Sequence, residues 1–93
     1  MKGRTKDSIN PVFDNFQYMS PKQVTLSCYL KMFRRKYNLS QAEMAGICSK
    51  YGQPHKIKFD QFEISNYENY KTIPTPPKFQ ILMNTLGITP EML

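Results

Sequence analysis

Tryptophan is absent from this chain of 93 residues, and cysteine and histidine are scarce, with two copies and one copy. Cys28 and Cys48 do not form a Cys-x-x-Cys pair, and His55 alone cannot complete a tetrahedral ligand set, so no zinc site is expected. Both cysteines fall in step with the apolar residues of predicted helices, which indicates buried free thiols. The sequence therefore predicts no metal and no other cofactor.

Long apolar runs are also missing. No stretch approaches the ~20 consecutive apolar residues of a membrane-spanning helix, so no membrane partner is expected. Residues 1–16 carry basic side chains without an apolar segment behind them, which is unlike a signal peptide. A cytoplasmic location is the resulting expectation, with nucleoid association if the source is a bacterium or a phage.

Recognisable sets of catalytic residues are also absent from the sequence. The four glycines form no phosphate-binding loop, and His55 has no serine or cysteine partner in a suitable context. Glu63 and Glu68 are five residues apart, a spacing that does not place two carboxylates on one helical face. An enzyme is therefore not expected.

Basic residues are abundant, and they are concentrated in the middle of the chain. The net charge is +6 overall. Residues 21–58 hold eight lysines and arginines against one acid, Glu43, a net charge of +7, whereas residues 59–93 sum to −2. The positive electrostatic field of such a segment suits a polyanion such as nucleic acid as partner. A solvated basic face without a partner would carry the same charge, so charge alone leaves both interpretations open.

Hydrophobic periodicity predicts one helical domain that follows a tail. Residues 1–19 show no helical or strand period, and we expect a flexible N-terminal tail that carries Phe13, Phe16 and Tyr18. Residues 20–93 are expected to form the domain. Helices are predicted near residues 21–37, 41–51, 60–69 and 77–86, with a fifth barely begun after Thr89.

Local signals mark where the second predicted helix begins and ends. Ser40 and Glu43 have the spacing of a capping box, in which each side chain bonds the backbone amide of the other residue. Gly52 and Pro54 indicate that the helix ends by about residue 51. A long, basic loop over residues 49–58 is therefore expected before the third helix.

Three short segments, in this order, carry a resemblance to a known family. The segments are Leu-Ser-Gln-Ala-Glu-Met-Ala at 39–45, Ile-Ser-Asn-Tyr-Glu-Asn at 64–69, and Leu-Met-Asn-Thr-Leu-Gly-Ile at 82–88. They resemble the Cro/CI (Xre-type) helix-turn-helix family, to which phage repressors belong. The resemblance implies an all-α, lambda-repressor-like bundle of four to five helices. It also implies a sequence-specific regulator of transcription that binds double-stranded DNA, of phage or bacterial type.

The resemblance assigns roles to individual residues. The third helix would lie in the major groove, and the side-chain amides of Gln61 and Asn66 suit adenine while Phe62 suits a thymine methyl group. Gln41, in the first turn of the second helix, would hold a phosphate. The residues expected to contact DNA, from the resemblance and from charge, are Ser40, Gln41, Lys50, Lys56, Lys58, Asp60, Gln61, Phe62, Asn66, Asn69 and Lys71.

A further pair is implied to be structural. The arginine of the first helix and the glutamate near the end of the recognition helix pair with each other in the family, and they correspond here to Arg34 and Glu68. We therefore expect an ion pair that supports the fold, and Arg34 is left out of the DNA-contact set despite its charge.

The sequence departs from the family pattern at three places. The turn before the third helix is longer than the usual ~3–4 residues, which gives a more distant similarity to POU-specific domains. Tyr70 stands where the family has glycine, so the backbone is expected to leave the third helix differently. Glu63 is expected on or beside the DNA-facing side, where it would accept from cytosine or repel phosphate.

Other interpretations stay open at this point. An antitoxin-like or adaptor module could use the same fold to hold a protein partner, and the aromatic tail would favour it. An RNA-binding or inhibitor protein could use the basic residues without reading bases. Family members often dimerise through the region after the fourth helix, so a homodimer is also considered.

Overall fold

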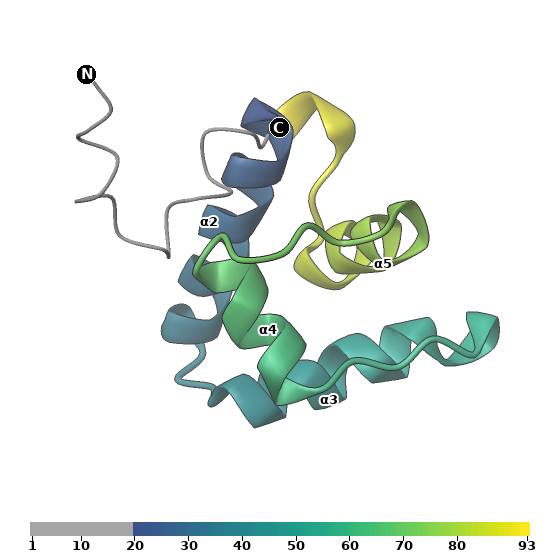
Figure 1. The fold of residues 1–93 in the computed structure, drawn as a ribbon. Helices are drawn as coiled ribbons and strands as arrows, with labels where there is room; N and C mark the ends of the chain where they lie inside the picture. Colours follow the sequence, from purple (N-terminus) through teal and green to yellow (C-terminus); the bar gives the residue numbers. More distant parts are fainter. Residues whose placement is uncertain (1–19) are drawn as a thin grey trace, which may run out of the picture.

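Four α-helices and two short 3₁₀ turns form the computed structural model, which describes residues 20–93 (Figure 1). No strand occurs within this range, so the all-α expectation is confirmed. The predicted tail, residues 1–19, lies outside the described residues. The elements are α2 (Pro21–Lys36), α3 (Gln41–Gly52), η3 (Gln53–His55), α4 (Gln61–Glu68), α5 (Pro76–Leu86) and η4 (Pro90–Met92).

The first three helices begin with reciprocal side-chain caps. The hydroxyl of Ser40 accepts a hydrogen bond from the amide of Glu43 at 3.0 Å, and the Glu43 carboxylate accepts from the amide of Ser40 at 2.8 Å. Ser20 caps α2 and Asp60 caps α4 in the same way. These bonds satisfy amide groups that have no partner within the helix, which is why α2, α3 and α4 start where they do.

The helices end on residues with left-handed backbone. Asn38, Lys56, Tyr70 and Gly87 have φ angles of 55°, 58°, 60° and 69°. In each case the next residue donates its amide hydrogen to a carbonyl five residues earlier, which closes a Schellman motif. Tyr70, which stands where the family has glycine, thus adopts a left-handed conformation that favours glycine.

Side chains support Tyr70 in this unfavourable conformation. Its hydroxyl lies 3.5 Å from the sulfur of Cys28, and the ammonium of Lys31 lies 5.9 Å from the centre of its ring. The hydrogen bond with Cys28 raises the pKa of Tyr70. A left-handed residue other than glycine costs about 1–2 kcal/mol, and these contacts offset part of that cost.

The core lies where α3 packs against α4 and α5, and α2 also packs against α4 and α5. Twelve apolar side chains form the buried cluster: Leu26, Leu30, Met44, Ala45, Cys48, Phe59, Ile64, Tyr67, Ile81, Leu82, Met83 and Ile88.

No helix within residues 20–93 is long and apolar enough to span a membrane.

The two cysteines differ in their surroundings. Cys48 is buried, and burial raises the pKa of its thiol to about 12. Cys28 is exposed on α2, so the expectation of two buried thiols is wrong for this residue. Leu26 and Leu30 on the same helix are buried, so the buried face of α2 does not extend to Cys28.

The connection between α3 and α4 is more regular than the predicted loop over 49–58. Helix α3 continues to Gly52 and passes directly into η3, so only the segment after Lys56 is extended. A Cβ at Gly52 would lie 2.4 Å from the carbonyl oxygen of Ile57, which explains why glycine is required inside this helix. The chain then runs back along α3 to reach α4 (Figure 1).

Candidate nucleic-acid interface

Helix α4 presents one polar face to solvent. With 3.6 residues per turn, Gln61, Ser65, Asn69, Phe62 and Asn66 span an arc of roughly 140°. All five are exposed or partly exposed, and Phe62 is 70% exposed. The opposite arc holds the buried residues Ile64, Tyr67 and Glu68. Gln61, Phe62, Asn66 and Asn69, four of the five residues predicted to contact DNA on or beside α4, therefore share one accessible surface, which we call the reading face.

The fifth of these residues, Asp60, also caps the helix. One of its carboxylate oxygens accepts a hydrogen bond from the amide of Glu63 at 2.8 Å, which caps α4. Asn69 is also engaged, because its side-chain amide donates to the hydroxyl of Ser65 at 3.3 Å. Gln61 and Asn66 are thus the residues on this face whose amide groups suit base edges best.

The N-terminal end of α4 is tied to α5 by Glu63. One oxygen of its carboxylate forms a salt bridge with Lys78, and the hydroxyl of Tyr67 donates to the same oxygen at 3.3 Å. The ammonium of Lys78 also lies 5.1 Å from the centre of the Phe59 ring. Glu63 therefore turns toward α5 and is neutralised there. The carboxylate of Glu63, beside the exposed face of α4, is therefore already paired with a cation.

A serine on α3 holds the residue that precedes this end. The hydroxyl of Ser49 accepts from the amide of Phe59 at 2.8 Å and donates to the Phe59 carbonyl at 3.1 Å. The backbone that leads into α4 is thus fixed to α3, immediately before Asp60. This contact anchors the start of α4 to α3.

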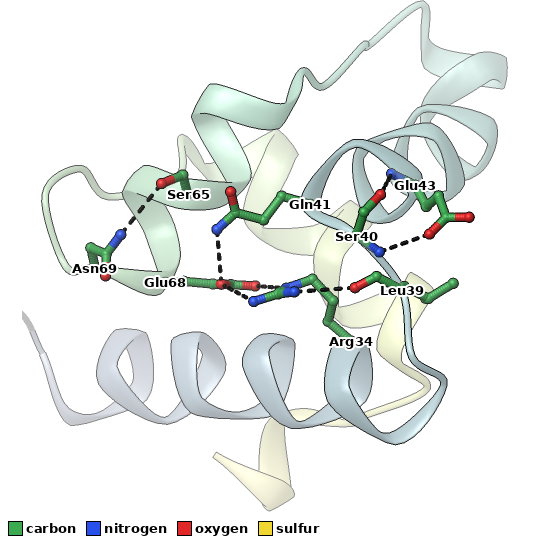
Figure 2. A network of polar contacts seen from close by, with 8 residues as sticks. All are labelled: Arg34, Leu39, Ser40, Gln41, Glu43, Ser65, Glu68 and Asn69. Atoms are coloured by element: carbon green, nitrogen blue, oxygen red, sulfur yellow. Dashed lines mark hydrogen bonds and ion pairs between the residues drawn. The ribbon is translucent and has the colours of Figure 1, made fainter.

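The C-terminal end of α4 is tied to α2 by the pair that the family resemblance implied (Figure 2). Two nitrogens of the Arg34 guanidinium donate to the two oxygens of Glu68, at 2.7 and 3.0 Å. A third nitrogen donates to the carbonyl of Leu39 at 3.1 Å. Hydrogen bonding to Glu68 raises the pKa of Arg34, and the Glu68 side chain is only 3% exposed.

Gln41 joins this network rather than pointing to solvent. Its side-chain nitrogen donates to Glu68 at 3.3 Å, as Figure 2 shows. The hydroxyl of Ser40 is used in the capping box. What the start of α3 can offer a phosphate is therefore its backbone amides rather than these two side chains.

The predicted basic contacts fall into two groups. Lys50, Lys56 and Lys58 are exposed and line one groove, between the outer face of α3 and the segment that returns to α4. Lys71 is exposed directly after α4. The structure thus brings three of the four lysines together on the α3 side.

Sequence reasoning missed Ser49 and Lys78. The spacing of Glu63 and Tyr67, four apart on one helix, gave a signal for their contact, but nothing in the sequence linked Lys78 to Glu63 on a different helix. Within residues 20–93, no group of three or more histidine, cysteine or acidic side chains is placed to hold a metal ion.

Comparison with known proteins gives one finding. The sequence profile of a family described as "Helix-turn-helix domain" matches residues 29–93, which is more than two thirds of the chain. No curated protein and no solved structure matches the chain. The matched range contains α3, α4 and α5 in full, together with the second half of α2.

Proposed function

Because the chain belongs to the Xre/Cro/CI-type helix-turn-helix family, whose domains bind DNA, we propose that it is a sequence-specific regulator that reads double-stranded DNA with α4. The helix would lie in the major groove, as recognition helices of such domains do. Family members are typically not enzymes. Repression by occupying a promoter is the regulatory outcome that needs nothing beyond the domain itself.

The observation that carries the proposal is the exposed face of α4. The Phe62 ring is 70% exposed, more than the other exposed large hydrophobic residues of the range 20–93, and beside it stand two side-chain amides that suit base edges. Phe62 would pack on a thymine methyl group, and Gln61 and Asn66 would pair with adenine. Both ends of the helix are tied to neighbouring helices, so this face is presented rigidly.

Phosphate contacts would orient the domain without reading sequence. The backbone amides of the first turn of α3 that the cap leaves unused would form one such site. Lys50, Lys56, Lys58 and Lys71 would add the electrostatic term that is independent of sequence.

The test begins with selection of preferred duplexes from a random pool. Gln61→Ala and Asn66→Ala should each weaken binding at the preferred site by about 1–3 kcal/mol and leave non-specific binding unchanged. Gln80→Ala is the matched control, because Gln80 is an exposed amide on α5. Equal losses on every sequence would show that these residues are not base readers. A palindromic site with half-sites about one helical turn apart would indicate a homodimer.

Salt dependence tests the lysines separately. Each phosphate contact contributes about −0.9 to the slope of log affinity against log salt concentration. Replacing Lys56 and Lys58 together by alanine should flatten this slope by up to roughly two units, with sequence preference unchanged. Lys22→Ala, at the far end of α2, is the control. A slope that stays unchanged in the double variant would remove these lysines from the interface, and tighter binding to RNA would favour the RNA-binding alternative.

A further inference from the structure

A groove of about 790 Å³ runs along the outer face of α3, open to solvent on one side. Its apolar lining comes from Leu39, Ile47 and Ile57, which are only partly buried. Gly46 leaves the middle of the groove empty, since a Cβ there would meet nothing within 4 Å. Along α3 and its C-cap the lining residues run from Glu43 to Gln53, about 15 Å along the helix axis at 1.5 Å per residue.

The rim of this groove is basic. Lys50, Lys56 and Lys58 all line it, and the one acid among the lining residues is Glu43. The Glu43 carboxylate already accepts a hydrogen bond from the amide of Ser40 at 2.8 Å, which occupies it in the helix cap. An occupant must therefore combine apolar side chains with negative charge.

We propose that this groove docks an acidic amphipathic peptide segment of a partner protein. A length of about 15 Å accommodates nearly three turns of a helix, and helices that lay an apolar face into an open groove are a common recognition mode. A second copy of this chain is a poor occupant. Residues 20–93 carry ten basic and five acidic side chains, so two copies repel each other at a basic rim.

Docking of the peptide would also regulate DNA binding. This second part of the inference rests on the proposed function. Lys56 and Lys58 would contact phosphate in the DNA complex and would pair with carboxylates in the peptide complex. One set of ammonium groups cannot serve both partners. The acidic segment therefore competes with DNA and releases the domain from its site.

The probe is a synthetic, fluorescein-labelled 14-residue helical peptide with leucine at positions 3, 6, 10 and 13 and mostly glutamate elsewhere. Fluorescence anisotropy with the full chain, in the absence of DNA, should show saturable binding. Two peptides serve as controls: a scrambled one of equal composition, and one with lysine in place of every glutamate. Both should bind at least tenfold more weakly.

Two variants locate the binding. Gly46→Leu places a side chain into the groove at a position where a Cβ meets nothing within 4 Å, and it should weaken peptide binding at least tenfold. Met32→Glu, at an exposed position on α2 outside the groove lining, should leave peptide binding unchanged. Thermal unfolding of both variants shows that they are folded.

The outcomes separate the two parts of the inference. Absence of saturable binding, equal binding of the scrambled or lysine peptide, or normal binding by Gly46→Leu would overturn the docking proposal. If the peptide binds and displaces a selected duplex, docking and competition are both supported. If it binds a complex that keeps its DNA, the competition is wrong and the docking site stands. If the chain binds the peptide but no duplex, the DNA-binding proposal fails and the docking site stands.

Discussion

The two ends of α4 are held by the same chemistry in different surroundings. At each end a glutamate of α4 pairs with a basic side chain of another helix, Glu63 with Lys78 and Glu68 with Arg34. The Glu68 side chain is 3% exposed, whereas the Glu63 side chain is 29% exposed. Burial decides what each pair contributes, because an unpaired charge is costly only where water cannot reach it.

This difference in burial gives the two ion pairs different roles. The buried pair joins α2, the start of α3 and the end of α4, so it supports the fold. The partly exposed pair lies next to Asp60, Gln61 and Phe62, the residues proposed to meet DNA. We expect substitutions at the first pair to change stability and substitutions at the second to change the reading of DNA.

The largest effect is expected from breaking the buried pair. Arg34→Ala leaves the Glu68 carboxylate buried with Gln41 as its remaining side-chain donor among residues 20–93, and the free energy of unfolding should fall by about 3 kcal/mol. Urea denaturation measures this change. Arg35→Ala, at the exposed neighbouring position, should cost less than about 0.5 kcal/mol.

A double substitution sharpens this result. Replacing Arg34 and Glu68 together by methionine removes both charges, so it should cost less than Arg34→Ala alone. If Arg34→Ala is as stable as the original chain, the two ends of α4 do not differ in the way that burial implies.

A smaller loss of stability is expected at the other end. Lys78→Met removes the salt bridge with Glu63 and the contact with the Phe59 ring, and it should cost about 1 kcal/mol. The preference for the selected duplex over random duplexes should fall as well, because the start of α4 loses its tie to α5. Lys78→Arg should restore both quantities in part. A variant that loses stability but keeps its full sequence preference would show that this pair does not position the reading face.

The smallest effect concerns the left-handed residues on either side of α4. Lys56→Gly, before the helix, relieves an unfavourable backbone conformation at an exposed site and should raise the free energy of unfolding by about 0.5 kcal/mol. Tyr70→Gly, after the helix, should gain less, because it also removes the contacts with Cys28 and Lys31. Thermal unfolding compares the two, and a larger gain at Tyr70 would mean that these contacts contribute little.

The features of the fold that depend on short sequence spacings could be predicted from the sequence. Helix bounds fall within about two residues of those expected, because caps and apolar periodicity act over short spacings. The family resemblance supplied Arg34 and Glu68, which are 34 residues apart and share no local pattern.

The remaining parts depend on tertiary packing. Gly52 was interpreted as a helix stop, but it lies inside α3 because the chain returns so closely over it at Ile57. Tyr70 takes a conformation that its own preference disfavours, since the helix exit demands it. Lys78 meets Glu63 only once α5 has packed on the core. None of these contacts has a signature in residue spacing.

Helix α4 has eight residues, and an isolated helix of fewer than ~12–15 residues is marginal in water. The reading face therefore exists only in the folded domain, which makes folding and DNA binding linked equilibria. A duplex that binds only the folded chain would stabilise it by about 2.7 kcal/mol at a free concentration of 100 times its Kd. Conversely, the apparent Kd rises in inverse proportion to the folded fraction. Temperature alone could thus release the domain from DNA, with no ligand and no change at the interface.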